Sequence, residues 1–338
     1  MDRVLSCFCP ATVVVVDDNV NFLESIVGCI SSDKFVLKCF SDPIKAANYI
    51  NQTEPFHALK ISDIVSMQYL PDVENQSPVI NIQNISSVVY DPERFRRIPV
   101  VLSDYFMPSM TGLEFFSRLK VSNVQKVLLT GMADNQVAIN AFNKGLIQGF
   151  LNKNGTDFSD RIVSMINVCL KRYYDFFTTS LVERYANNKE MVLNDPIFAN
   201  FFTSLLSAIS PVEYYLTDPY GSFMFVSDTG QVYLLDVVTE SEMATIVKLG
   251  EDSGEADPKV LAALRSRESI LVTRNMDGKL PPVKDWHRYL KPAKSLIGYS
   301  TYYFHLDEHA DTDERFNTIQ GFKQYKKKVG SEAIDSCE

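Results

Sequence analysis

Residues 13–18 read VVVVDD, and this stretch decides the fold of the first half of the chain. Four consecutive β-branched side chains are typical of a strand that is buried on both faces, as in a parallel sheet. A segment with helical periodicity follows from about Asn19, and a second apolar run at Phe35–Phe40 leads into the helix-starting sequence Ser41-Asp42-Pro43. This alternation of short strands and helices predicts an α/β fold.

The alternation continues to about residue 175. Apolar runs at 99–103, 126–129 and 149–152 predict three more strands, and helical segments follow each of them. The last helix begins near Asp160 and continues past Leu181 without Gly or Pro, which predicts an unusually long helix. We therefore predict a (βα)5 doubly wound parallel sheet over residues 11–175, with a connector helix over 160–190.

Residues 54–97 interrupt this pattern before the third strand. They form an insertion of about 40 residues, where such connections usually need about 2–6. The insertion enters the third strand at its amino end and therefore lies at the edge of the sheet opposite the usual ligand-binding edge. Two explanations of the insertion are equally good: it is an element that docks a partner, or it is a lineage-specific addition without a function.

The polar residues that carry chemistry all fall where a predicted strand ends, and they are Asp17, Asp18, Asp104, Thr130 and Lys153. Because the carboxyl ends of parallel strands meet at one edge, these side chains are expected to converge. Three carboxylates cannot share a buried site without compensating positive charge, which Mg²⁺ or a lysine supplies. A helix cap or a solvated turn would explain any one of them alone, but it explains the set of five poorly.

On these residues the chain resembles the CheY-like receiver domain of two-component response regulators. The matching positions lie within residues 11–175, and they are the acidic pair at 17–18, VLSDYFMP at 101–108 followed by Gly112, LLTG at 128–131, and FLNK at 150–153. The resemblance implies the receiver fold and the chemistry of phosphoryl transfer.

The resemblance assigns the acceptor and the metal ligands. Asp104 would take a phosphoryl group from a histidine kinase or a phosphotransfer protein, forming an acyl phosphate. Asp17, Asp18, Asp104 and the backbone carbonyl of Phe106 would hold Mg²⁺.

The resemblance also assigns the switch. Lys153 and Thr130 would contact the phosphoryl oxygens, and the threonine would move when phosphate arrives. Phe150 matches the switch aromatic of the family, which rotates inward when the threonine shifts.

Two departures from the family pattern concern the same site. The family usually has a proline after the lysine, in a cis peptide that fixes the lysine loop, whereas this chain has Asn154, so we expect a looser lysine. Phe106 and Met132 are large and apolar at positions where the family controls access of water. We therefore predict slow hydrolysis of the phosphorylated form.

The second half predicts an α+β output domain over residues 195–320. A helix starts at Asp195-Pro196, an antiparallel meander occupies 214–236, and more helices and strands follow. The layout loosely resembles a PAS-type sensory module. His305, Asp307, Glu308 and His309 could be arranged as a metal cluster, although exposed strand-end polar residues are the better explanation. Residues 321–338 are predicted to be a basic, flexible tail.

Composition limits the function classes. The chain has 338 residues and a net charge of −9, which opposes unspecific attraction to nucleic acid or anionic lipid. The six cysteines are sparse and lack zinc spacing, and there is no long uncharged apolar run, so a cytoplasmic protein without a membrane span is expected.

The combined interpretation is a non-enzymatic response regulator. Phosphorylation at Asp104 would switch the output domain through conformation or homodimerisation and change its binding to a downstream protein. In an alternative, the output domain binds a nucleotide or nucleic acid through Lys323–Lys328 and regulates gene expression. The whole chain also resembles the quorum-sensing response regulators of Legionella. An enzymatic output domain is a third hypothesis, which no set of acid, base and nucleophile supports.

Overall fold

The chain forms two compact units, each built from segments that are far apart in the sequence. The computed structural model describes residues 3–57, 65–68, 77–131, 134–184, 191–272, 280–308, 310, 314–329 and 334–335, with only the backbone described at 54–57, 65–68, 77–80, 184 and 334–335. The α/β unit comprises Cys9–Leu59, Asp91–Phe177 and Gln320–Glu338, and the α+β unit comprises Met1–Phe8, Lys60–Tyr90 and Thr178–Ile319.

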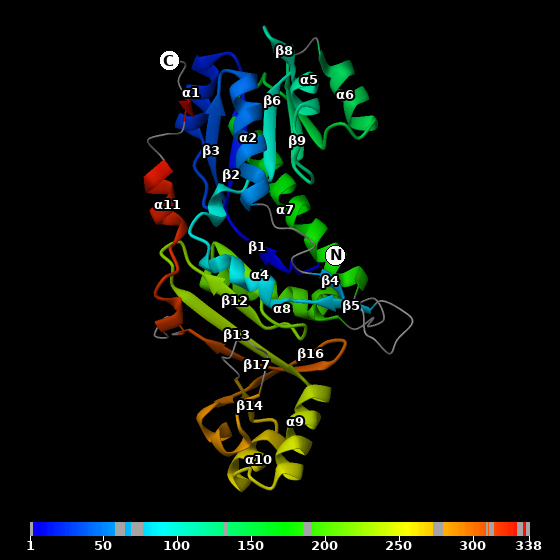
Figure 1. Cartoon of the computed structure of the whole chain (residues 1–338), viewed down its shortest axis with the longest axis vertical. Helices are drawn as coiled ribbons and strands as arrows, with labels where there is room; N and C mark the ends of the chain where they lie inside the picture. Colours follow the sequence, from blue (N-terminus) through cyan, green and yellow to red (C-terminus); the bar gives the residue numbers. More distant parts are fainter. Residues whose placement is uncertain are drawn as a thin grey trace. The chain divides into compact units, whose positions relative to one another are not determined.

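A parallel sheet forms the centre of the α/β unit (Figure 1). Its strands in spatial order are β10 (Gly149–Asn152), β9 (Gln125–Thr130), β6 (Val100–Asp104), β2 (Ala11–Val16), β3 (Phe35–Phe40) and the short β18 (Ile334–Asp335). Every neighbouring pair is parallel. All six residues of β2 are buried, as its unbroken apolar sequence predicts.

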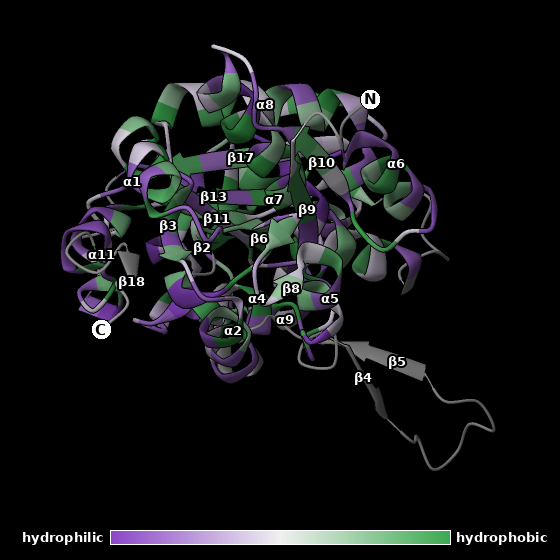
Figure 2. Cartoon of the chain, turned by 90° about the horizontal axis from the view of Figure 1, so that it is seen from above, coloured by the Kyte–Doolittle hydropathy of each residue, from purple (hydrophilic) through white to green (hydrophobic). Residues whose placement is uncertain are grey.

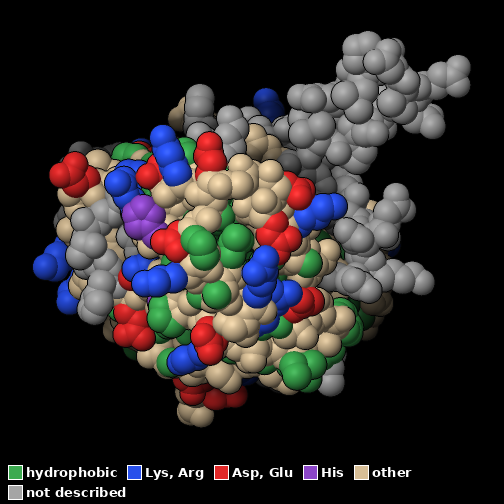
Figure 3. All heavy atoms as spheres, turned by 90° about the horizontal axis from the view of Figure 1, so that it is seen from below, with side chains coloured by type: hydrophobic (Ala, Val, Ile, Leu, Met, Phe, Trp, Pro, Cys, Tyr) green, Lys and Arg blue, Asp and Glu red, His purple; other side chains and the backbone are tan. Residues whose placement is uncertain are grey.

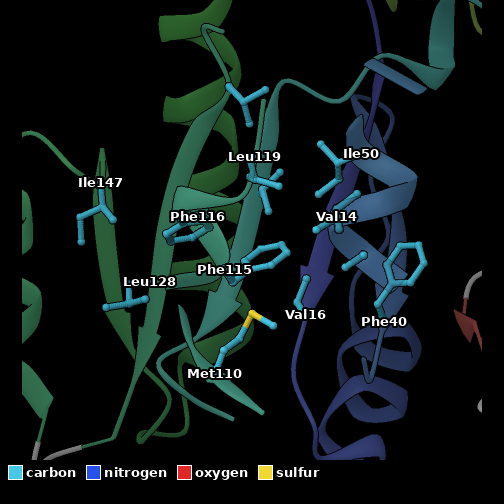
Figure 4. Packing of buried hydrophobic residues seen from close by; sticks show 14 of the residues in the cluster. Val14, Val16, Phe40, Ile50, Met110, Phe115, Phe116, Leu119, Leu128 and Ile147 are labelled. Carbon is cyan, nitrogen blue, oxygen red and sulfur yellow. The ribbon is translucent and has the colours of Figure 1, made fainter. Parts of the chain in front are cut away.

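Helices cover both faces of this sheet, which confirms the predicted doubly wound fold. They are α1 (Val20–Cys29), α2 (Pro43–His57), α5 (Gly112–Ser117), α6 (Asn135–Asn143) and α7 (Phe158–Arg184). Figure 2 shows α1 and α7 on one side of the strands, with α2 and α5 on the other. The core on the second side joins strand residues such as Val14 and Leu128 to Ile50, Phe115 and Phe116 (Figure 4).

An antiparallel sheet forms the α+β unit, as predicted for the second half. Its strands in spatial order are β1 (Cys7–Phe8), β11 (Glu213–Leu216), β12 (Phe223–Val226), β13 (Val232–Thr239), β17 (Thr301–Asp307) and β16 (Lys294–Ile297). Helix α8 (Pro196–Ile209) packs on this sheet through aromatic rings, with 4.6 Å between the ring centroids of Phe202 and Phe223. The meander β11–β12–β13 is the element that the turn sequences predict.

A second layer of this unit surrounds Trp286, which is fully buried. It consists of α9 (Glu240–Ser253), α10 (Pro258–Arg265), β14 (Ser269–Leu271) and β15 (Leu290–Pro292). The other described elements of this unit are β4 (Val65–Gln68), β5 (Ser77–Ile80), α4 (Gln83–Ser87) and 3-10 turns at Val88–Tyr90, Val192–Asn194, Val283–Arg288 and Glu314–Phe316. A 3-10 turn at Arg94–Arg96 belongs to the α/β unit.

The unit boundaries differ from the predicted domain boundaries. Residues 60–90, most of the predicted insertion, belong to the α+β unit, and so do residues 1–8, because β1 pairs with β11. The connector helix α7 has 27 residues and continues from the α/β unit into the α+β unit after Phe177. In the described part of the chain, no helix combines the length and the apolar character that crossing a membrane requires.

The C-terminal segment also differs from the flexible tail predicted over 321–338. Helix α11 (Phe322–Val329) packs within the α/β unit. Phe322 is fully buried there, and 5.1 Å separate the ring centroids of Phe322 and Phe95. The ammonium group of Lys326 bonds to Asp33 at 3.1 Å. The ordering follows from the spacing of Phe322 and Tyr325, which places both rings on one helix face.

Candidate functional site

Three carboxylates meet at the carboxyl edge of the parallel sheet. Asp17 and Asp18 follow β2, and Asp104 ends β6, and one ligand oxygen from each lies within 4.8 Å of the others. The register of the two strands, with Val16 opposite Ser103, brings these ends together. Asp17 is 1% exposed and Asp104 is 9% exposed, so two of the three carboxylates are largely removed from solvent.

Lys153 supplies the positive charge of this cluster. Its backbone N–H donates to the carbonyl of Thr130 at 2.9 Å, which fixes the start of the loop after β10. Its Nζ lies 2.5 Å from Asp17 Oδ2 and 2.5 Å from Asp104 Oδ1. Burial raises the pKa of Asp17 above its ordinary value, although the hydrogen bond and charge of Lys153 act in the opposite direction.

The charge balance of the cluster fits a divalent cation. Three carboxylates face one ammonium group, and Asp18 lies on the exposed side of the cluster. Oxygen donors arranged around an open side are the ligands that Mg²⁺ prefers, since it retains water and accepts phosphate oxygens. Asp17, Asp18 and Asp104 therefore suit Mg²⁺ by their chemistry.

A tight hairpin follows β6, the strand that ends at Asp104. Strands β7 (Phe106–Met107) and β8 (Met110–Thr111) pair, and the Phe106 N–H donates to Asp104 Oδ2 at 3.2 Å. This bond places the Phe106 backbone beside the carboxylate, while its side chain is 72% exposed. Gly112 begins α5 so close to β6 that a Cβ there would lie 2.4 Å from the Asp104 carbonyl oxygen.

Thr130 and Phe150 lie on neighbouring strands behind this cluster. Thr130 is fully buried, and its hydroxyl donates to the carbonyl of Leu151 at 3.4 Å. Phe150 is half-buried and contacts the ring of Phe142 edge-on, with the centroids 6.3 Å apart. In the register of the two strands, Thr130 lies opposite Asn152, and Phe150 lies opposite Leu128.

The comparison with solved structures supports the fold that carries these five residues. Over 99% of both chains, this chain is similar to the Legionella pneumophila response regulator LqsR, with 29% sequence identity and a TM-score of 0.76. The α/β unit is a CheY-like receiver domain. The whole chain is LqsR-like, since the similarity covers the α+β unit as well.

Receiver domains alone match about half of this chain. The receiver domain protein from Clostridium thermocellum is 18% identical over 48% of this chain and 95% of its own, with a TM-score of 0.30. The BeF3-activated DrrB receiver domain is 16% identical over 48% of this chain and 98% of its own, with a TM-score of 0.30. No family model matches the chain, and no curated protein matches it.

The lysine loop of this receiver domain has contacts that the sequence does not suggest. Asn154 follows Lys153, and its N–H donates to Asn152 Oδ1 at 2.8 Å, while its carbonyl accepts from Arg161 at 2.7 Å. The Lys153 ammonium lies 4.6 Å from the centre of the Phe22 ring. The strand-end rule does not point to Phe22 or Arg161, because Phe22 lies inside α1 and Arg161 lies inside α7.

The structure does not support a metal site formed by His305, Asp307, Glu308 and His309. His305 Nδ1 lies 3.0 Å from the carbonyl of Pro292, and His309 lies outside the described residues. Of the residues that the structure describes, the cluster of Asp17, Asp18 and Asp104 is the one that gathers three metal-ligating side chains. Met132, predicted to influence water access beside Thr130, also lies outside the described residues.

Proposed function

We propose that this chain is a two-component response regulator that is phosphorylated on Asp104. The observation that carries the proposal is the position of this carboxylate, 2.5 Å from Lys153 and grouped with Asp17 and Asp18 at the carboxyl edge of the sheet. The donor would be a histidine kinase or a phosphotransfer protein in the cytoplasm. The receiver fold and the similarity to a response regulator support this class of partner.

In the proposed reaction an Asp104 carboxylate oxygen attacks the phosphorus atom of a phosphohistidine. A new O–P bond forms, the P–N bond breaks, and its electron pair returns to the imidazole nitrogen, which takes up a proton. When bound, Mg²⁺ would offset the negative charge of the phosphoryl oxygens. Asp17, Asp18, Asp104 and the carbonyl of Phe106 would hold it.

Lys153 and Thr130 would contact the phosphoryl group on Asp104. Lys153 already contacts the attacked carboxylate, so it needs a small movement to reach a phosphoryl oxygen. The Thr130 hydroxyl would leave the carbonyl of Leu151 and donate to the phosphoryl group. Phe150 would then occupy the space beside Thr130, and the receiver population would shift to its active conformation.

An exposed apolar surface near Phe150 supports homodimerisation as the output step. The side chains on α6, α7 and the loop after α6 that are 39% to 53% exposed are Ile139, Phe142, Leu146, Val168 and Phe176. Arg172 on α7 donates to the carbonyl of Gln148 at 2.9 Å, which holds α7 beside the loop that enters β10. The switch would change this surface and, through it, the binding of a downstream protein by the α+β unit.

The alternative of nucleotide or nucleic-acid binding has less support. Of the lysines at 323–328, Lys326 bonds to Asp33 and Lys328 lies 3.7 Å from Glu93, so acidic side chains of the same unit offset part of their charge. On the face drawn in Figure 3, basic and acidic side chains are interspersed. A polyanion needs a continuous basic surface to bind well.

The test is phosphorylation with acetyl phosphate and Mg²⁺, followed by intact mass and sedimentation velocity. Wild type should gain the mass of one phosphoryl group and shift toward dimer, whereas Asp104→Asn should do neither. Asp160→Asn, at an exposed aspartate in the first turn of α7, is the matched control and should behave as wild type. Removing Mg²⁺ with EDTA should stop the reaction.

Absence of a mass gain on wild type, or a gain on Asp104→Asn, would refute the assignment of the acceptor. A phosphorylated protein that stays monomeric would refute the dimerisation step alone.

A further inference from the structure

We propose that Phe22 is a positioning residue for Lys153, acting through a closed circuit of contacts that returns to the lysine loop at Asn154. The proposal rests on the proposed phosphorylation of Asp104 and identifies what aims the lysine at that site. The circuit runs from Lys153 to Phe22 on α1, then to Phe158 and Arg161 on α7, and back to Asn154.

The first contact is between the ammonium group and the face of the Phe22 ring. Lys153 Nζ lies 4.6 Å from the ring centre while it contacts the carboxylates of Asp17 and Asp104 at 2.5 Å each. A cation over an aromatic face is attracted by the ring quadrupole. The ring therefore faces the same ammonium group that the two carboxylates contact.

The Phe22 ring is itself held in place. Asn19 caps α1 by accepting the Phe22 N–H on Oδ1 at 3.2 Å, and the Asn19 N–H donates to Asp17 Oδ1 at 3.1 Å. The ring of Phe158 packs against Phe22 with 5.7 Å between centroids and an interplanar angle of 48°. The start of α1 is thus tied to the same carboxylate that the lysine contacts.

Arg161 closes the circuit. Its guanidinium lies 5.8 Å from the centre of the Phe158 ring and donates to the carbonyl of Asn154 at 2.7 Å. Arg161 Nε also donates to Asp157 Oδ1 at 3.1 Å, and this hydrogen bond fixes the guanidinium group. The circuit therefore begins and ends on adjacent residues of one loop.

These contacts counter the flexibility of the Lys153 side chain. A lysine side chain has four rotatable bonds and is flexible unless its head group is held. Asn154 restrains the loop backbone through Asn152 and Arg161, but neither bond reaches the ammonium group. The two carboxylates hold the ammonium group from one side, and the Phe22 ring adds a further restraint at the ammonium itself.

The experiment compares full-length Phe22→Leu with Phe22→Tyr. Leucine keeps an apolar side chain on α1 and removes the ring face, whereas tyrosine retains the face. The first readout is the NMR signal of the Lys153 side chain in lysine-labelled protein, assigned by its loss in Lys153→Arg. Wild type and Phe22→Tyr should show an upfield ring-current shift, and Phe22→Leu should lose it.

The second readout is the rate of phosphorylation by acetyl phosphate. Phe22→Leu should react about three- to five-fold more slowly at saturating Mg²⁺, with an unchanged unfolding midpoint, and Phe22→Tyr should match wild type. Arg161→Gln opens the circuit without changing α1 and should reduce the ring-current shift, which keeps the proposal testable if Phe22→Leu unfolds.

A ring-current shift that persists in Phe22→Leu, or a wild-type rate in that variant, would overturn the positioning role. The spectroscopic readout does not require phosphorylation. If wild type takes up no phosphoryl group, the proposed function fails, whereas the presence or absence of the shift still decides the role of Phe22.

Discussion

At the scale of single residues, Phe106 is an exposed aromatic ring two positions after the proposed acceptor Asp104. Its backbone N–H is bonded to Asp104 Oδ2 at 3.2 Å, and its side chain is 72% exposed. An apolar ring at this position offers no hydrogen bond to an approaching water molecule. The phosphorylated form should therefore lose its phosphoryl group slowly.

The change Phe106→Asn should accelerate hydrolysis of phospho-Asp104 by roughly ten-fold, since an amide can orient the attacking water. The decay is followed by intact mass after removal of acetyl phosphate. The matched control is Ile297→Asn, at a side chain that is 76% exposed on β16 of the other unit. Equal decay rates for Phe106→Asn and wild type would contradict this role.

The strand-end chemistry could be predicted from sequence, whereas the support around it could not. Asp17, Asp104 and Lys153 follow from one rule, because parallel strands place their carboxyl ends at one edge. Phe22 and Arg161 depend on how two helices pack and on rotamers that the pattern of apolar residues does not encode. Helical periodicity predicts only that Phe22 lies on a helix.

At the scale of elements, α5 is pressed against the end of β6. Gly112 is the first residue of α5, its N–H donates to the carbonyl of Tyr105 at 2.8 Å, and the capping box of Thr111 and Glu114 starts the helix there. A side chain at position 112 would meet the Asp104 carbonyl and the side chain of Leu128. Glycine is required by the close approach of the two elements.

Gly112→Ala should destabilise the protein by about 1–3 kcal/mol, because the added methyl group overpacks the helix–strand contact. It should also slow phosphorylation by displacing the end of β6. Urea unfolding monitored by circular dichroism measures the first effect.

Gly28→Ala provides the matched control. Gly28 is exposed on α1 with no atom within 4 Å of the new methyl group, so the variant should be neutral or more stable by about 0.5–1 kcal/mol. Equal changes in the free energy of unfolding for the two variants would contradict the role of the close approach at Gly112, since helix propensity alone favours alanine at both positions.

For the long helix α7, the local sequence predicts the length but not the contacts with other segments. Its length follows from an apolar pattern without Gly or Pro, and the structure confirms it with 27 residues. Its bonds to the N-terminal segment do not follow from any pattern. The Tyr174 hydroxyl donates to the carbonyl of Cys9 at 2.7 Å, and Thr178 Oγ1 accepts the Ser6 N–H at 2.8 Å.

At the scale of the whole molecule, the two units are interleaved in sequence. Each unit consists of three chain segments, so the chain passes from one unit to the other five times, after residues 8, 59, 90, 177 and 319. The sequence predicts two consecutive domains because periodicity is a local signal. A two-residue strand such as β1 carries too little pattern to reveal a partner in the second half.

The isolated segment 195–338 should therefore fail to fold. It lacks β1, residues 60–90 and the C-terminal part of α7, all of which belong to the α+β unit, and it carries α11, which packs on the other unit. Its ¹H–¹⁵N spectrum should be poorly dispersed and its thermal unfolding non-cooperative.

Full-length Asp104→Asn serves as the folded control for these measurements. A well-dispersed spectrum and a cooperative transition for the segment 195–338 would contradict the interleaved architecture. Assays of output activity accordingly require the full chain.

The pairing of β1 with β11 also affects how the protein is made. Cys7 lies opposite Tyr215, a separation of 208 residues, so at about 5–20 residues per second a ribosome needs roughly 10–40 s to supply the partner strand. During that interval β1 has no partner in its sheet, and the α+β unit cannot be completed. Recombination that exchanges the α+β unit for another domain by a single junction would break this pairing, which restricts how a chain with this architecture can evolve.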